Sequence, residues 1–350
     1  MKTPIRFVLS TLTLLGLAIA VSGVAVAQTL NVGSTPSASD SFPAWAYPWD
    51  PDFKVPPADD VPHRLPGSTA AFSWAQARDL FFAPDWHPED HPPMPAIVAS
   101  GRKPEVRACG SCHRSEGTGG PENSSLAGLS VAYFTQQMAD FKSGARKFSG
   151  PQRSAVLLMN AAAKTMTDAE VRAAAEYFAA LKPKQNTKVV ESDTVPKTYI
   201  ARLFFVKRAE GGTETLGRRI VEMPDDVEQF ELRDTRSQFT AYVPVGSVAK
   251  GEELVSTGSA GRTTPCGICH GADLTGLGPI PSIAGRSPSY IVRQLYDFQH
   301  GERTGQWSPL MANVVSKLSE EDLISIAAYL ASRAPCSSLN HRACGVSGLS

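Results

Sequence analysis

The sequence CGSCH at residues 109–113 decides the fold, and the related sequence CGICH follows at residues 266–270. Each contains two cysteines one helical turn apart, with a histidine directly after the second cysteine. The chain holds only six Cys and seven His among 350 residues, so random composition would place this pattern far less than once. C-x-x-C-H is the pattern that attaches c-type haem, because its thiols bond to the two vinyl groups and its histidine binds the iron.

The two motifs therefore predict two covalently bound haem c groups. The predicted thioether residues are Cys109, Cys112, Cys266 and Cys269, and the predicted histidine ligands of the irons are His113 and His270. A C-x-x-C pair can also be a redox disulfide or half of a zinc site. A redox disulfide would need a βαβ context, and a zinc site would need further Cys or His at short spacing. Neither flank of either motif supplies these features.

The sequence after each motif is also repeated. Residues 128–146 (GLSVAYFTQQMADFKSGAR) match residues 285–303 (GRSPSYIVRQLYDFQHGER), and the offset equals the separation of His113 from His270. Such internal similarity indicates a duplicated domain. Each copy predicts a helix, the motif, a loop, a second helix, a methionine loop and a closing helix. Thr167-x-x-Glu170 and Ser319-x-x-Asp322 have the capping-box pattern that starts the closing helices.

A haem iron that only carries electrons takes a second axial ligand, and methionine in that place raises its reduction potential. Met311 is the only methionine after the second motif, and Met159 aligns with it. We therefore predict Met159 and Met311 as the second iron ligands. Met138 and Met166 are interpreted as core residues, the usual use of methionine. The remaining histidines are interpreted as surface or loop residues: His63, His87, His91, His300 and His341.

These features resemble the tandem class I cytochromes c, most closely the dihaem cytochrome c-four type. The resemblance covers residues 101–182 and 248–333, and it rests on both motifs, the turns at Gly128 and Gly285, the repeated helices and the aligned methionines. It implies a mainly α fold, with each copy wrapped around one haem. In this family a proline carbonyl orients the haem histidine; Pro281 fits that place, whereas the first copy has Ser124.

The resemblance also implies single-electron transfer between a respiratory complex or dehydrogenase as donor and an oxidase or reductase as acceptor. Two alternatives stay open. One is a dihaem enzyme, either peroxidase-like or thiosulfate-oxidising, which would need one iron without a fixed methionine. The other is a haem subunit of a membrane-associated dehydrogenase, so peripheral membrane association is possible. The balance of 34 basic and 34 acidic residues argues against a nucleic-acid partner.

Residues 1–27 read as a signal peptide with an A-x-A cleavage site, which predicts a periplasmic protein; an uncleaved membrane anchor is the alternative. Extra segments flank and separate the two copies. The predicted division is a Pro- and aromatic-rich extended arm at 28–68, cytochrome domain 1 at 69–184, an inter-domain insert at 185–247, domain 2 at 248–334 and a tail at 335–350.

Domain 1 is expected to open with a helix at residues 70–83, equivalent to residues 249–255, followed by an insertion at 84–104 that covers an edge of the haem. The arm is interpreted as a surface-wrapping segment, or alternatively as a docking arm with aromatic anchors. The insert is predicted to be a small β region with strands at 198–206, 219–222 and 238–243 and a hairpin turn at Gly211-Gly212. Cys336 and Cys344 are predicted to form a disulfide.

Overall fold

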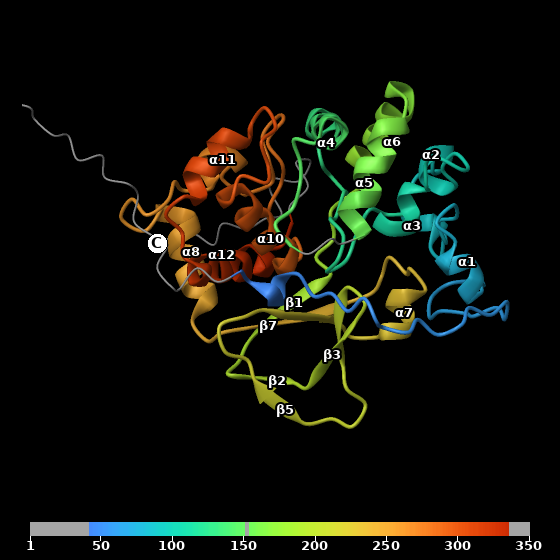
Figure 1. Cartoon of the computed structure of the whole chain (residues 1–350), viewed down its shortest axis with the longest axis horizontal. Helices are drawn as coiled ribbons and strands as arrows, with labels where there is room; N and C mark the ends of the chain where they lie inside the picture. Colours follow the sequence, from blue (N-terminus) through green and yellow to red (C-terminus); the bar gives the residue numbers. More distant parts are fainter. Residues whose placement is uncertain (1–41, 151–153, 336–350) are drawn as a thin grey trace, which may run out of the picture. The chain divides into compact units, whose positions relative to one another are not determined.

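Two groups of helices, one around each C-x-x-C-H motif, flank a small set of strands (Figure 1). The computed structural model describes residues 42–150 and 154–335. Helices dominate and the strands lie between the two copies, which confirms the mainly α fold with a β insert. The proposed signal peptide and the Cys336–Cys344 disulfide lie outside the described residues. Within the described ranges, no helix has the length and apolar character needed to cross a membrane.

The first copy consists of short helices before and at the motif and three longer ones after it. They are α2 (Ala96–Ala99), α3 (Cys109–His113), α4 (Val131–Ser143), α5 (Ser154–Thr165) and α6 (Asp168–Ala180). Helix α4 packs against α5 and α6. Phe134, Met138 and Phe178 meet in their shared core, where Met166 is also buried. The interpretation of Met138 and Met166 as core residues is thereby confirmed.

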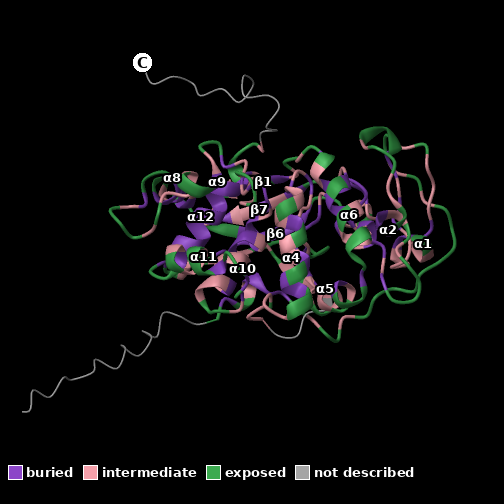
Figure 2. Ribbon diagram, turned by 90° about the horizontal axis from the view of Figure 1, so that it is seen from above, coloured by how far each residue is buried: buried purple, intermediate pink, exposed green. Residues whose placement is uncertain are grey.

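The second copy repeats this order with longer flanking helices. They are α8 (Ser247–Thr257), α9 (Gly267–His270), α10 (Pro288–Gln299), α11 (Ser308–Val315) and α12 (Glu320–Ser332). Helix α12 packs against α8 and α10, and it is almost wholly buried (Figure 2). Both closing helices begin with the predicted capping boxes, formed by Thr167 with Glu170 and by Ser319 with Asp322.

The predicted opening helix of the first copy is wrong. Helix α1 covers only Trp74–Arg78, and it packs with Trp86 and Leu232 in a cluster separate from the core under α6. The counterpart of the end of α8 is α2, which lies inside the supposed insertion and packs against α6. Prolines 92, 93 and 95 reduce this helix to one turn, because proline disfavours helix in the residue before it and cannot donate a backbone hydrogen bond.

The methionine loops are helices instead. Met159 lies within α5 and Met311 within α11. Both segments are rich in Ala, Leu and Val, and the proline of α11 stands in its first turn, where the missing N–H costs no hydrogen bond. A helix fixes the direction of each methionine side chain more firmly than a loop would.

The insert folds as three small sheets and one short helix. The elements are β1 (Thr187–Glu191), β2 (Thr194–Pro196), β3 (Thr198–Ala201), β4 (Phe204–Lys207), β5 (Thr213–Thr215), β6 (Val221–Pro224), α7 (Val227–Glu231) and β7 (Phe239–Val243). The main sheet has the order β1-β7-β6, with β1 parallel to β7. The predicted strand at 198–206 is instead a hairpin that turns at Arg202, whose φ is 59°. Gly211-Gly212 does not close a hairpin, because β4 pairs with β3 and β5 pairs with β2.

The insert and the arm are tied to the helices by buried polar contacts. The Glu222 carboxylate accepts hydrogen bonds from Ser287 Oγ at 2.6 Å and from Ser289 N at 3.1 Å, at the start of α10. From the arm, the Tyr47 hydroxyl donates to Asp297 Oδ1 at 2.8 Å, and Trp45 Nε1 donates to Glu320 Oε1 at 2.8 Å. These two aromatic residues of the arm therefore pack on the second copy and are not free docking anchors.

Candidate functional site

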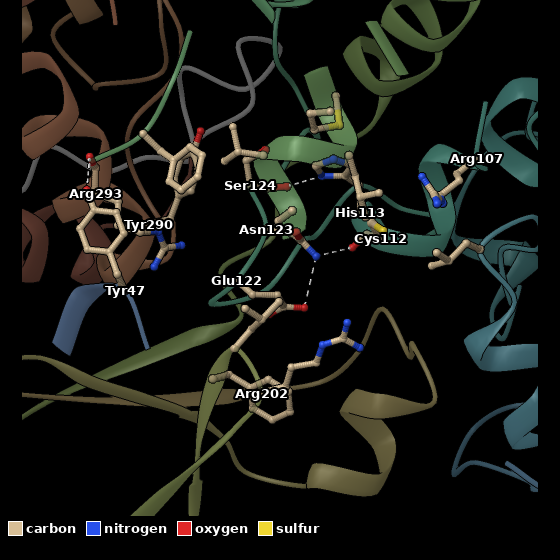
Figure 3. Close-up of a pocket in the computed structure, with 18 of the residues that line it drawn as sticks. Tyr47, Arg107, Cys112, His113, Glu122, Asn123, Ser124, Arg202, Tyr290 and Arg293 are labelled. Atoms are coloured by element: carbon tan, nitrogen blue, oxygen red, sulfur yellow. Dashed lines mark hydrogen bonds between the residues drawn. The ribbon is translucent and has the colours of Figure 1, made fainter. Parts of the chain in front are cut away.

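Helix α3 presents the first motif to a cavity that is lined by the first copy and also by the insert and α10 of the second copy. His113 is buried, and its Nδ1 donates a hydrogen bond to the Ser124 carbonyl at 2.9 Å (Figure 3). A carbonyl can only accept, so Nδ1 carries the proton and Nε2 remains the nitrogen with a free lone pair. Two adjoining hollows of about 120 and 530 Å³ are lined by Cys112, His113 and Met159. The carbonyl expected from Ser124 is therefore in place although the proline is missing.

Helix α9 repeats this arrangement in the second copy. His270 Nδ1 donates to the Pro281 carbonyl at 2.7 Å. Cys266, Cys269, His270 and Met311 line a single cavity of about 400 Å³. A backbone carbonyl performs the same task in both copies, so the exchange of Pro for Ser leaves the orientation of the imidazole unchanged. Such a partner fixes the tautomer and the ring plane of a metal-binding histidine.

Burial sets the protonation of these groups. It lowers the pKa of His113 and of His270, which favours the neutral imidazole that binds metals. It raises the pKa of the Cys109 thiol to about 12 and that of Cys266 to about 11. None of the four motif cysteines forms a disulfide. Two free thiols, one oriented imidazole and one thioether around each largely apolar cavity fit a covalently attached haem.

The two motifs differ in how far they are covered. In the second copy, Cys269 is exposed and Ile268 retains 68% of its accessible surface. In the first copy, Ser111, which occupies the place of Ile268, retains 1%. A Cβ added to Gly110 would lie 2.7 Å from the Ala83 side chain, so the segment before α2 packs directly on this motif. The same Cβ would lie 3.0 Å from the carbonyl oxygen of Val98, which belongs to the segment 84–104 that is expected to cover an edge of the first site.

A network of partly buried side chains joins the two copies between the cavities. Arg146 Nη2 donates to the Tyr290 hydroxyl at 3.0 Å and to Gln294 Oε1 at 2.9 Å. Arg303 reciprocates by donating to Gln137 Oε1 at 2.7 Å. The loops that carry the two arginines also pair through their backbones. Burial alone would raise the pKa of Tyr290, but the charges of Arg146 and Arg303 outweigh it and lower that pKa.

These residues lie within the repeated sequence, but the repeat alone gives them no role. Arg146 and Arg303 occupy equivalent places, as do Gln137 and Gln294. Polar residues repeated at matched positions of two copies are the signal that could have identified them. Their hydrogen bonds go to amide and hydroxyl oxygens, and Arg146 lines the first cavity whereas Arg303 lines the second. Each buried guanidinium therefore faces a space that fits a haem.

His87 lies in a loop, as predicted, but not at the surface. It is fully buried, and its Nε2 donates to Asp234 Oδ1 at 3.0 Å. The side chain of His91 is also covered and pairs with Asp85 at 3.0 Å. Both residues fasten the segment between α1 and α2, with His87 held by the insert. Among the described residues, no group of His, Cys, Asp and Glu is arranged to hold a separate metal ion.

Two largely apolar cavity regions, each lined by a C-x-x-C-H helix and by a helix that carries a methionine, define a c-type cytochrome. The profile of the cytochrome c family matches residues 98–182. Cytochrome c-554(548) of Halomonas halodenitrificans is 36% identical over 89 residues, which are 25% of this chain and 98% of that protein. The chain belongs to the cytochrome c family, whose members carry covalently bound haem c and transport electrons.

Longer relatives share both copies or parts of them. Cytochrome c4 of Azotobacter vinelandii is 32% identical over 133 residues, and the match covers 34% of this chain and 63% of that protein. A thiosulfate dehydrogenase electron acceptor of Thiomonas intermedia is 26% identical over 235 residues, covering 66% of this chain and 80% of that protein. The chain thus spans somewhat less than two thirds of the cytochrome c4 relative. These similarities support a cytochrome of the dihaem kind.

Proposed function

We propose that this protein transfers single electrons between two redox proteins through two haem c groups with the same ligand set. Haem c, when bound, supplies a reversible one-electron change at its iron. The residues that would hold the two haems are Cys109, Cys112, His113 and Met159 in the first copy and Cys266, Cys269, His270 and Met311 in the second. We also propose that the copies are separate cytochrome domains, at 69–184 and 248–334, joined by the insert at 185–247.

The observation that carries this proposal is the matched pair of cavities. In each, an imidazole oriented by a carbonyl and a helix-borne methionine line the same space. An iron held by both residues would have no open position for a substrate, so its coordination would change little between the oxidised and reduced states. That property suits an electron carrier.

The network between the copies supports transfer from one haem to the other. Arg146 and Arg303 would neutralise haem carboxylates, because buried guanidinium groups require anionic or polar partners. Their shared hydrogen bonds with Gln137 and Gln294 hold the two copies in register. The two haems would then lie on either side of a rigid polar layer.

The exposed surface around the second motif is the docking site that we propose for a redox partner. Four large apolar side chains of the second copy are exposed in and around the second cavity: Trp307 at 46% and Leu310 at 57% line it, whereas Ile268 at 68% and Leu277 at 64% lie outside its lining. Exposed apolar groups in such number mark interaction sites. The occupant would be a protein with an apolar surface around its own redox centre. The names of two relatives favour a thiosulfate dehydrogenase as the electron donor.

The site of action that we propose is the periplasm, on the strength of the signal sequence and the cytochrome c4 relatives. Peripheral attachment to a membrane-bound dehydrogenase fits the same electron-transfer role. A dihaem enzyme is the second candidate, because of the thiosulfate dehydrogenase relatives. It would need an iron with an exchangeable ligand, and the paired methionines argue against that.

Absorption spectroscopy of the purified protein with thiosulfate, peroxide and cyanide distinguishes an electron carrier from a dihaem enzyme. A carrier should show two one-electron steps, slow cyanide binding and no turnover of thiosulfate or peroxide by itself. It should accept electrons when a purified thiosulfate dehydrogenase and thiosulfate are added. Rapid cyanide binding to one ferric haem, together with turnover of either substrate, would contradict the carrier function and favour the enzyme.

A further inference from the structure

The residue that follows each haem histidine has the same backbone conformation but a different identity. Arg114 has φ 68° and Gly271 has φ 82°. Their ψ angles are 163° and 153°, and this positive-φ, extended region is essentially restricted to glycine and costs other residues about 1–3 kcal/mol. The second copy therefore uses the unstrained residue, whereas the first copy retains a strained arginine. Strain of this kind is often associated with a functional role.

The Arg114 side chain is enclosed rather than directed into solvent. The residue retains 1% of its accessible surface, and its guanidinium lies over the Phe230 ring at 4.6 Å. Its three side-chain nitrogens are buried without a hydrogen-bond partner among the described residues. Phe230 belongs to α7, so the insert supplies the cover over this charge. Nothing equivalent encloses Gly271, because the two residues after it, Ala272 and Asp273, are exposed.

Other charged groups near Arg114 nearly balance it. Its electrostatic neighbours are the carboxylates of Glu122 and Asp234 and the guanidinium of Arg233. Arg233 lies 4.0 Å from Glu122, and Asp234 is hydrogen-bonded to His87 and to Gln229. Without Arg114, this buried cluster beside His113 would carry one net negative charge. With Arg114 the cluster is neutral.

We propose that Arg114 is a fixed buried charge that raises the reduction potential of the first haem, an inference that rests on the proposed haem at His113. Oxidation adds one positive charge at the iron, and a neighbouring cation in a poorly screened interior opposes that change. Arginine stays protonated at all physiological pH values, so the effect is permanent. Two haems with the same ligands thereby acquire different potentials, and Arg114 acts as a positioning charge that biases where the electron resides.

The test is a redox titration of the full-length holoprotein, followed by absorbance, in the wild type and in variants. Arg114→Gly restores the residue of the second copy and relieves the backbone strain. For an assumed separation of about 10 Å and an effective dielectric constant of ~20, Coulomb's law gives a change in the equilibrium of roughly tenfold or somewhat more. We therefore expect the equilibrium constant for moving an electron from the first haem to the second to rise about tenfold. This corresponds to a fall of about 59 mV in the reduction potential of the first haem.

Matched variants separate charge from structure. The first haem of Arg114→Lys should keep a reduction potential close to that of the wild type. In Arg114→Gln that potential should fall by as much as in Arg114→Gly. Gly271→Arg places the same charge at the exposed counterpart in the second copy. Because solvent screens that charge, the equilibrium constant for electron transfer between the haems should change less than twofold. The titration is repeated with each variant combined with Met311→Ala. Because that change shifts the reduction step of the second haem, the step that does not shift belongs to the first haem.

An unchanged first-haem potential in Arg114→Gly and Arg114→Gln, with both haems attached, would overturn the role of Arg114 and leave the electron-carrier function intact. Equal falls in Arg114→Lys and Arg114→Gln would also overturn it, because they would trace the effect to packing on Phe230. Fewer than two haems in the wild type would contradict the proposed function itself. Thermal unfolding of each variant verifies that the fold is retained.

Discussion

The two motif regions have the same ligand types but opposite exposure. Around the second motif, Cys269, Ile268 and Leu277 face solvent, whereas around the first, Gly110 and Ser111 are buried. The duplicated helices and carbonyl partners account for what is common. The difference comes from segments present only once, namely the stretch before α3 and the β insert. Duplication therefore fixes the candidate ligand set, while the added segments determine access and electrostatic environment.

The cover over the first region is a set of specific contacts between the two added segments. Trp86 Nε1 donates to the Leu232 carbonyl at 2.7 Å, and His87 pairs with Asp234 at 3.0 Å. Both pairs join the segment before α2 to the insert. Under the proposed function, protein partners exchange electrons directly with the second haem, which is therefore the entry site for electrons. The first haem exchanges electrons only through the second.

The largest effect is expected from removing one methionine at a time. Met311→Ala should abolish the near-red absorption band of the second haem and lower its reduction potential. If electrons enter at the second haem, reduction by thiosulfate dehydrogenase has a first phase at that haem and a second phase at the first haem. Met311→Ala should slow the first phase at least tenfold. Met159→Ala should leave that first phase unchanged and alter only the second phase. Stopped-flow absorbance measures both. A slowed first phase in Met159→Ala would contradict the claim that electrons enter at the second haem.

A charge on the exposed apolar surface is expected to have the next largest effect. Leu277→Asp should reduce the bimolecular rate of electron transfer from thiosulfate dehydrogenase about tenfold, because it places a carboxylate in an apolar contact. Val245→Asp is the matched control, since Val245 is 63% exposed but belongs to the turn between β7 and α8 and not to the proposed docking surface. Equal rates for the two variants would show that the partner docks elsewhere.

The partly buried network between the copies should matter mainly for stability. Arg146→Leu removes the donor to the Tyr290 hydroxyl and one of the two guanidinium donors to each glutamine oxygen, whereas Arg303 still donates to both, so we expect a loss of about 1.5–3 kcal/mol in the free energy of unfolding. Arg172→Ala removes an exposed pair with Glu176 and should cost less than about 0.5 kcal/mol. Denaturant unfolding of the haem-loaded protein compares them. Equal losses would mean that the network does not join the two copies.

The two capping boxes predict a smaller, pH-dependent difference. Burial opposes ionisation of Asp322, but hydrogen bonds from Ser319 and Lys250 outweigh it and lower its pKa; Arg102 lowers the pKa of Glu170. A lowered folded-state pKa gives stability that is present above the unfolded value and is lost as the pH falls through the folded one.

Asp322→Asn should therefore cost about 1–2 kcal/mol at pH 7, and Glu170→Gln less than about 1 kcal/mol, because the Asp322 side chain is inaccessible and that of Glu170 is 19% exposed. Both differences from the wild type should shrink as the pH falls below about 4. Unfolding curves at pH 7 and pH 3.5 test this. A cost for Asp322→Asn that stays constant between the two pH values would exclude the carboxylate as its source.

Local patterns were readable from the sequence, and contacts between distant segments were not. The C-x-x-C-H helices and capping boxes depend on residues three or four positions apart, so their spacing predicts them. The strand at 198–206 conceals a turn at Arg202, which is neither Gly nor Pro and therefore gives no turn signal. The role of Arg146 depends on the other copy, and the burial of His87 depends on Asp234 in the insert. Such long-range partners need the fold.

The most direct test of the central claim is a combined haem count and near-infrared redox titration of the purified protein. Two covalently bound haems per chain, each with the near-red band of methionine-ligated ferric haem and each titrating by one electron, is the result that we predict. A single haem per chain, or a second haem without the methionine band, would contradict the account of two matched electron-transfer centres.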